Sequence, residues 1–203
     1  MLTGSLPAGL PIICICGPSA AGKTTFTAAL AARLRERGFR PLVIACDDYY
    51  RSDWSPHSRF GFDTVDAIDA EALLRELQEA RCRGLSTLRT YDMPNRRVGA
   101  RTPEAFYDLI LLEGAYGPQL VLSSISPDLL VYIHEFLALR IWRRLLRDVR
   151  CRRRSVAYVI RQMVMEMLPG ERLFIQPLRD QATLVIRNHP SAVQVVVSAL
   201  DLG

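Results

Sequence analysis

The apolar residues of this chain gather in short continuous runs that alternate with segments of helical periodicity. Continuous runs predict buried strands of a parallel sheet, because such strands are covered on both faces. We expect strands at residues 11–16, 41–46, 108–112, 129–133 and 182–186, and residues 193–200 are a candidate for a sixth strand at the sheet edge.

Between the strands, apolar residues recur every three or four positions, which indicates amphipathic helices. The first helix is expected over 22–37 and ends at Gly38, a favourable C-terminal cap. A second helix carries the leucines of 73–77 and begins at Asp66 or Asp69, because either side chain can accept hydrogen bonds as an N-cap.

Two more helices are predicted in the C-terminal half. The first is long, with an apolar face opposite many arginines. That face consists of Leu137, Ile141, Leu145 and Val149. The second covers about 156–168, and we expect Pro169 and Gly170 to interrupt it, since proline lacks the backbone N–H that a helix requires.

The middle of the chain predicts an irregular segment and a small ribbon. Residues 51–66 have few periodic apolar positions, so we expect a loop there. Residues 85–91 and 97–101 predict a β-ribbon around a turn at 92–95. Strands that alternate with helices indicate right-handed β-α-β units and an α/β sandwich. Ligands of such sheets bind at the carboxyl ends of the strands.

The segment between the first strand and the first helix reads GPSAAGKT, which is the phosphate-binding pattern G-x-x-x-x-G-K-[ST]. Its glycines free the backbone to turn its N–H groups toward a phosphate. Lys23, the only lysine of the chain, can reach the β- and γ-phosphates, and the Thr24 hydroxyl can ligate Mg²⁺. We expect the Lys23 side chain to be exposed. The residues expected to hold ATP or another NTP are Gly17, Ser19, Ala20, Ala21, Gly22, Lys23, Thr24 and Thr25.

Composition narrows the function classes. The chain has 203 residues, of which 49% are hydrophobic and 23% charged, as in an ordinary globular protein. The formal charge of +5 is consistent with a nucleic-acid binder or with arginines that hold phosphate groups. The chain has no basic tail that would favour nucleic-acid binding. The five cysteines contain no C-x-x-C pair, so we interpret them as reduced thiols. With no signal-like or membrane-spanning apolar run, we expect a cytoplasmic protein that binds neither membranes nor nucleic acid.

Acidic residues follow two of the predicted strands at the edge where the phosphate loop lies. Glu113 follows the third strand, where a carboxylate is typical of the Mg²⁺ partner in P-loop enzymes. Asp47 and Asp48 follow the second strand, and in extended chain their side chains face opposite ways. One of them can therefore point into the site and accept the proton of an attacking hydroxyl. The alternative for each acid is a solvated strand end.

Arginines gather on the late helix and directly after it. Arg144 and Arg147 are three residues apart and share a helix face, and the run 152–154 follows. Guanidinium groups suit the charge on a transferring phosphoryl group, and a cap over the site excludes water. We expect an arginine-rich lid at about 150–155, with a solvated basic face as the alternative.

As an ordered set, these features resemble the uridine kinase family of P-loop kinases, close to the phosphoribulokinases. The matching stretches are 17–25, 46–51, 62–67, 90–92, 111–114, 143–148, 152–154, Pro177 and 182–186. The resemblance implies a three-layer P-loop NTPase fold with a five-stranded, mostly parallel sheet of order 2-3-1-4-5. It also implies one kinase domain over 1–203, with an acceptor insertion at about 51–101 that contains the ribbon.

The resemblance implies roles residue by residue. Asp47 matches the aspartate that activates the acceptor hydroxyl, and Lys23, Arg147 and Arg152 complete the implied catalytic set. Arg154 is implied at the nucleotide. Thr24, Glu113 and Asp47 are the implied Mg²⁺ ligands. Residues implied at the acceptor are Tyr50, Asp63 for ribose hydroxyls, Tyr91 for the pyrimidine, Arg96, Arg144 and Gln162.

The departures from the family pattern concentrate on the nucleobase side. A second base-contacting aromatic is here Met93, and the base-reading histidine is Arg96. The family's His-Pro after the ribose aspartate is Thr64-Val65, and Arg153 and Ser155 replace a glycine and an aspartate of the lid. A pocket with Arg96 suits an anionic or carbonyl-rich acceptor better than a neutral pyrimidine. The alternative is that Arg96 turns out to solvent.

The sequence therefore predicts an ATP- and Mg²⁺-dependent kinase for a hydroxyl of a small molecule, uridine kinase-like in acting on a nucleoside 5′-hydroxyl. One alternative is a kinase for another hydroxylated metabolite, of the phosphoribulokinase or pantothenate kinase type. Another is a nucleotide-binding switch without an acceptor site, and a third, through the arginines, is a nucleic-acid binder. An enclosed acceptor cavity beside Asp47 would separate the kinase from the switch. A homo-oligomer stays open.

Overall fold

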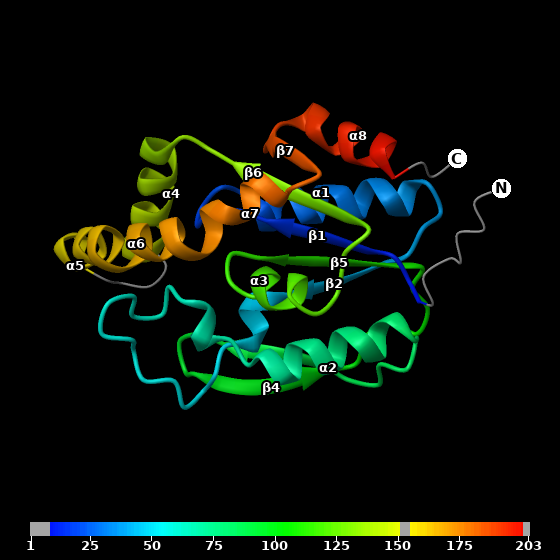
Figure 1. The fold of residues 1–203 in the computed structure, drawn as a ribbon, viewed down its shortest axis with the longest axis horizontal. Coiled ribbons are helices and arrows are strands. Elements are labelled where there is room, and N and C mark those ends of the chain that lie inside the picture. Colours follow the sequence, from blue (N-terminus) through cyan, green and yellow to red (C-terminus); the bar gives the residue numbers. More distant parts are fainter. Residues whose placement is uncertain (1–8, 151–154, 201–203) are drawn as a thin grey trace.

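The computed structural model describes residues 9–150 and 155–200, and the structural statements below concern these residues. A five-stranded sheet forms the centre, with strand order β2-β5-β1-β6-β7 and every neighbouring pair parallel (Figure 1). The strands are β1 (Ile12–Cys16), β2 (Pro41–Ala45), β5 (Leu109–Gly114), β6 (Leu129–His134) and β7 (Leu184–Arg187). Counted along the chain, this is the predicted order 2-3-1-4-5.

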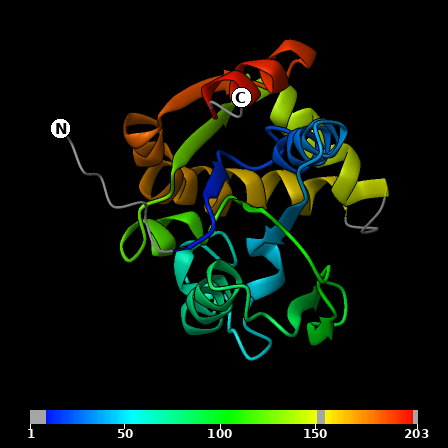
Figure 2. The same cartoon turned by 90° about the vertical axis from the view of Figure 1, so that its right-hand side faces the viewer.

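Helices cover both faces of the sheet and make three layers (Figures 1 and 2). One face carries α1 (Lys23–Glu36) and α8 (Pro190–Ala199), and the other carries α2 (Ala70–Arg81) and α3 (Pro118–Leu122). Ile13 of β1 belongs to the core that contains Phe26 of α1, whereas Cys14 belongs to the core that contains Leu73 of α2. The apolar run is continuous because successive side chains of the strand serve opposite layers.

The segment between β2 and β5 carries the small elements. It contains two short 3₁₀ helices, Cys46–Tyr49 and Val65–Ala67, and the antiparallel ribbon of β3 (Leu88–Asp92) and β4 (Arg97–Arg101). Of the two predicted N-caps, Asp69 is the one that caps α2, because its Oδ1 accepts the backbone N–H of Ala72 at 3.1 Å. The ribbon of β3 and β4 lies where the sequence pattern predicted it.

The long helix α4 (Leu137–Arg150) forms as predicted, but its buried face differs. Leu137 is 44% exposed, whereas Arg140, Arg144 and Asp148 are buried. Ile141, Leu145 and Val149 are only partly buried and pack on the helix that follows. The prediction that the arginines lie opposite the buried face was wrong for Arg140 and Arg144, because these two are buried in ion pairs with Glu171 and Asp63.

The helix after residue 154 does not stop at Pro169 and Gly170, which corrects the prediction. Helical backbone continues through α5 (Val156–Gln162), a π-helical segment (Met163–Met167), α6 (Leu168–Gly170), a second π-helical segment (Glu171–Ile175) and α7 (Gln176–Gln181). The wider π turns on both sides accommodate the proline that lacks an N–H donor. Gly170 packs so closely that a Cβ there would lie 2.2 Å from the carbonyl oxygen of Asp63.

The candidate sixth strand at 193–200 is a helix, α8, and that prediction was wrong. Its valines favour strands by propensity, but the His189 side chain accepts the N–H of Ser191 as an N-cap, and Pro190 occupies the first turn. Ala192, Val196 and Val197 then face α1 at helical spacing. Tertiary burial of this face overrides the local preference of valine.

Four of the five cysteines lie among the described residues. Cys14, Cys16, Cys46 and Cys82 are free, and the first three are buried. No helix among the described residues has the length and apolar character to cross a membrane.

Candidate active site

The phosphate loop, residues 17–22, joins β1 to the N-terminus of α1. Gly17 and Gly22 have φ of 138° and 97°, in the left-handed region that favours glycine. A Cβ on Gly17 would lie 2.2 Å from the Ile133 carbonyl oxygen, and one on Gly22 would lie 2.6 Å from Asn188 Nδ2. Ala20 adopts φ of 60°, which is uncommon for a residue with a Cβ. The loop is therefore held in the curled backbone that the sequence pattern predicts.

Lys23 is buried rather than exposed, which corrects the sequence expectation. Its side chain is folded onto the loop, where Nζ donates to the Pro18 carbonyl oxygen at 3.0 Å, and the residue is 9% exposed. Burial lowers the pKa of Lys23, and the nearby carboxylates of Glu113, Asp47 and Glu171 oppose that effect. The ammonium group thus lies among carboxylates at the end of β1.

Thr24 and Glu113 meet beside the loop as the sequence predicted. The Thr24 hydroxyl donates to Glu113 Oε1 at 3.0 Å, and Glu113 is 7% exposed. Burial raises the pKa of the Glu113 carboxyl, and Lys23 opposes it. Among the described residues, no group of three or more His, Cys, Asp and Glu side chains could hold a metal ion. Mg²⁺ in kinases is held by one or two protein oxygens together with phosphates and water, and these two oxygens fit that role.

Asp47 and Asp48 point in different directions, although not for the predicted reason. They lie in the 3₁₀ helix Cys46–Tyr49, not in extended chain. Asp47 is exposed and lines the main cavity, whereas Asp48 Oδ1 accepts the backbone N–H of Tyr91 at 2.9 Å. Burial raises the pKa of the Asp48 carboxyl, and the Tyr91 N–H opposes that rise. Of the two carboxylates, Asp47 is therefore the one that faces the cavity.

A cavity of about 970 Å³ runs from the phosphate loop to the turn of the β-ribbon. Most of the predicted site residues line it. These are Ser19, Ala20, Gly22, Lys23, Thr24, Thr25, Asp47, Tyr50, Asp63, Tyr91, Arg96, Glu113, Arg144, Arg147 and Gln162. Gly17 and Ala21 belong to the loop but are not among the lining residues, and Arg152 and Arg154 lie outside the described residues. In the described part of the structure, residues predicted for the nucleotide and residues predicted for the acceptor thus line one cavity.

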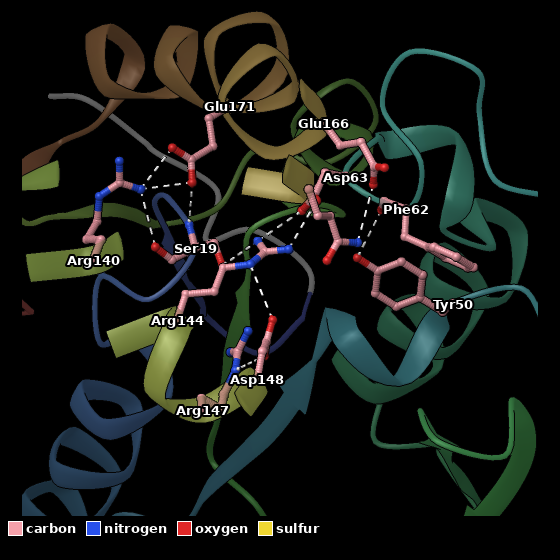
Figure 3. A network of polar contacts seen from close by, with 11 residues as sticks. Ser19, Tyr50, Phe62, Asp63, Arg140, Arg144, Arg147, Asp148, Glu166 and Glu171 are labelled. Carbon is pink, nitrogen blue, oxygen red and sulfur yellow. Dashed lines mark hydrogen bonds and ion pairs between the residues drawn. The ribbon is translucent and has the colours of Figure 1, made fainter. Parts of the chain in front are cut away.

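The part of the cavity lined by the residues predicted to bind the acceptor contains aromatic rings and an ion pair. The rings of Tyr50 and Tyr91 lie 6.1 Å apart, and the Tyr50 hydroxyl donates to the Phe62 carbonyl oxygen at 3.4 Å. Asp63 forms an ion pair with Arg144, with Nη2 and Oδ2 3.3 Å apart (Figure 3). Asp63, which the resemblance predicts to hold ribose hydroxyls, therefore has a cationic partner in this structure.

Arg96 is exposed to solvent, and it also lines the rim of the cavity. It adopts φ of 53°, its guanidinium donates to the Trp54 carbonyl oxygen, and Cζ lies 5.5 Å from the centre of the Phe62 ring. The two contacts keep its charge at the rim of the cavity, opposite the phosphate loop. Arg96 is therefore exposed and held at the rim at the same time, and its role in acceptor choice stays a prediction.

Three residues with clear structural roles were missed by sequence reasoning. Asp148, wholly buried, accepts from Arg147 Nε at 3.0 Å and lies 3.6 Å from Arg144 Nε, so it orients both arginines (Figure 3). Its four-residue spacing from Arg144 was a usable signal. Arg140 and Glu171 contact the phosphate loop from distant elements, and no local pattern identifies them.

Comparison with known proteins identifies the family. Residues 12–194 match the profile of the Phosphoribulokinase / Uridine kinase family. A relative named uridine kinase, from Staphylococcus haemolyticus, is 31% identical over 187 residues, which cover 88% of this chain and 88% of that protein.

Solved structures agree on the fold. A structure described as a possible uridine kinase from Bacillus stearothermophilus superposes with a TM-score of 0.63 at 21% identity, covering 90% of this chain and 91% of that one. Phosphoribulokinase from Rhodobacter spheroides superposes with a TM-score of 0.59 at 18% identity, covering 86% of this chain and 68% of that one. At these identities the two structures support the three-layer α/β fold alone.

Proposed function

The chain belongs to the phosphoribulokinase / uridine kinase family and is a P-loop kinase that phosphorylates a hydroxyl group of a small molecule; we propose that its acceptor is polyhydroxylated and carries an anionic or carbonyl-rich group. The reaction is uridine kinase-like, with ATP and Mg²⁺ at the phosphate loop. One observation carries the proposal: Lys23, Asp47, Asp63 and Arg96 line a single cavity. A nucleotide-binding switch binds no second substrate, so it would not require the acceptor half of that cavity.

The donor half supports phosphoryl transfer from ATP. The loop N–H groups and the N-terminus of α1 favour phosphate binding, and Lys23 can leave Pro18 to contact the β- and γ-phosphates. Thr24 and Glu113 would hold Mg²⁺, which supplies charge neutralisation on the transferring phosphoryl group. Arg147, 44% exposed and held by Asp148, is placed to contact the same charge.

The acceptor half supports a hydroxylated substrate. Asp47 would accept the proton of the attacking hydroxyl, and Asp63 would accept hydrogen bonds from neighbouring hydroxyls. Tyr50, Tyr91 and Gln162 are proposed to contact the remainder of the molecule. Arg96 presents fixed donors and a charge at the far end, which favours carbonyl or anionic groups over a neutral ring.

The second candidate is uridine or cytidine itself. It is favoured by the name of the relative that is 31% identical and by the position of Tyr91 in the cavity. Against it stands the loss of a stacking aromatic at Met93, which also lines the cavity. Steady-state kinetics on nucleosides, sugar phosphates and hydroxylated acids separate the two.

We expect kcat/KM for uridine and cytidine to fall below the ordinary enzyme range of about 10⁴–10⁸ M⁻¹s⁻¹, with an anionic polyhydroxylated compound inside it. Arg96→Gln, which keeps hydrogen-bonding capacity without the charge, should lower kcat/KM for that compound and leave the Kd for ATP unchanged. A value for uridine or cytidine inside the range would establish the plain uridine kinase activity instead. We also retain the cytoplasm as the proposed location, where buried free thiols such as Cys14 stay reduced.

A further inference from the structure

Ser19, in the middle of the phosphate loop, has all its polar groups engaged by distant side chains. Its backbone N–H donates to Glu171 Oε1 at 2.9 Å, and its carbonyl oxygen accepts from Arg140 Nη1 at 3.2 Å. Its hydroxyl accepts from Arg144 Nη1 at 3.2 Å. Figure 3 shows these groups converging on the loop from α4 and from the helical segment above it. The peptide groups on both sides of Ser19 are therefore held from outside the loop.

Arg140 and Glu171 also bind each other. Arg140 Nη1 lies 2.8 Å from both carboxylate oxygens of Glu171, and the residues are 7% and 3% exposed. Glu171 is the first residue of a π-helical segment, a local distortion that is frequent at functional sites. The pair joins two elements that are separated by 31 positions in sequence and brings both onto one residue of the loop.

Stability alone does not account for this pair. Arg140 Nε is buried without a hydrogen-bond partner among the described residues. A buried ion pair that leaves a donor unsatisfied recovers its desolvation cost incompletely, and replacing such a pair with apolar groups is often neutral for folding. The contacts that apolar replacements could not reproduce are those to Ser19.

The pair also affects the charge near the phosphate site. Glu171 is one of the carboxylates whose field acts on Lys23. Burial raises the pKa of the Glu171 carboxyl, and Arg140 opposes that rise. Without Arg140, an uncompensated carboxylate would remain beside the loop that receives the phosphates of the nucleotide, where it would repel them.

We propose that Arg140 and Glu171 are positioning residues that clamp the Ser19 peptide groups and hold the phosphate loop in its nucleotide-binding shape. Because Arg140 lies on the helix that carries Arg144 and Arg147, the clamp also sets the distance between the loop and these arginines. The inference rests on the proposed function only in requiring that the loop binds a nucleotide.

The test compares single and double replacements. Arg140→Met and Glu171→Met each leave one buried charge unpaired and should unfold at lower temperature than wild type. The double variant Arg140→Met/Glu171→Met removes both charges, so its melting temperature should return close to wild type. Its kcat/KM for ATP should nevertheless fall about 10²-fold, since a loop displaced by about 1 Å loses this much. Glu171→Gln keeps an oxygen for the Ser19 N–H and should retain most of the activity that Glu171→Met loses.

Two readouts do not depend on the acceptor. The Kd for ADP, measured by calorimetry, should rise in the double variant, and the Ser19 amide should exchange its hydrogen faster than in wild type. The control Arg40→Gln/Asp108→Asn removes an ion pair at the amino ends of β2 and β5. It should change neither the Kd for ADP nor the exchange rate of the Ser19 amide. If nucleotide affinity and Ser19 exchange in the double variant equal wild type, or if affinity follows melting temperature across all variants, the clamp has no positioning role. If wild type itself fails to bind ADP, the proposed function fails, while Ser19 exchange still decides the clamp.

Discussion

Arg144 and Asp63 form a buried ion pair across the cavity, although they are 81 positions apart in sequence. Their side chains are 7% and 11% exposed, and Nη2 lies 3.3 Å from Oδ2. Burial acts to lower the pKa of Arg144, but Asp63 and Asp148 outweigh it and raise its pKa, so the guanidinium stays charged. The hydroxyls of an acceptor would therefore share the Asp63 carboxylate with Arg144, which couples acceptor binding to the arginine that contacts Ser19.

Replacing Asp63 should affect both the acceptor and folding. Asp63→Asn removes the charge that holds Arg144, so KM for the acceptor should rise at least about tenfold while the Kd for ATP stays unchanged. The free energy of unfolding should fall by about 3 kcal/mol, at the low end for a broken buried pair, because Asp148 still contacts Arg144. Urea unfolding and steady-state kinetics measure the two effects. Asp66→Asn, on the exposed side of the same segment, is the matched control, and equal behaviour of both variants would contradict the acceptor role.

Replacing Lys23 should remove transfer without unfolding the protein. Lys23→Ala takes away the only lysine at the phosphates, so turnover should fall by at least about 10²-fold, to background. Stability should change little, because the lost contact to the Pro18 carbonyl oxygen is offset by the removal of a buried charge. A coupled assay of ADP release gives the rate, and circular dichroism checks the fold. Arg33→Gln, on the exposed face of α1, should behave as wild type, and wild-type turnover by Lys23→Ala would show that the loop does not act in transfer.

The acid pair should respond asymmetrically. Asp47→Asn should lose about 10²–10⁴-fold in kcat, the usual contribution of a general base, with ATP binding roughly kept. Asp48→Asn should be mild, because the amide oxygen can still accept the Tyr91 N–H. Single-turnover rates with saturating ATP measure both. If Asp48→Asn proves the more damaging variant, the base is the other residue of the pair.

Gly170 should tolerate no side chain. In Gly170→Ala the Cβ would lie 2.2 Å from the Asp63 carbonyl oxygen, so the helix or the acceptor segment must shift. We expect a loss of about 1–3 kcal/mol in unfolding free energy, as for overpacked cores, and a raised KM for the acceptor. Gly84→Ala, whose Cβ would come no closer than 3.7 Å to its nearest neighbour, is the control for unfolding. Wild-type unfolding and kinetics in Gly170→Ala would show that this contact relaxes without cost.

The sequence by itself determined the features that depend on near neighbours in the chain. The strands of the sheet, the turn of the ribbon and the phosphate loop are encoded by local apolar runs and by residues with special backbone conformations. Glu113 and Asp47 could be predicted because strand ends of a parallel sheet meet at one edge, so their position follows from the strand itself. The burial of Lys23 could not be predicted in this way, since the Pro18 carbonyl oxygen and the carboxylates that surround Lys23 come together only in the folded protein.

Only the tertiary structure decided the contacts between elements that are distant in sequence. The arginine pattern of α4 is compatible with a solvated helix face and with a buried one. The face is buried because Glu171 and Asp63 form ion pairs with Arg140 and Arg144. Pro169 and Gly170 read as a helix end, yet packing of Gly170 on Asp63 keeps the backbone helical through them. The physical reason is common to both cases: the free energy of a buried charge or a close backbone contact depends on its partner, and the chain segment that contains the residue does not specify which partner that is.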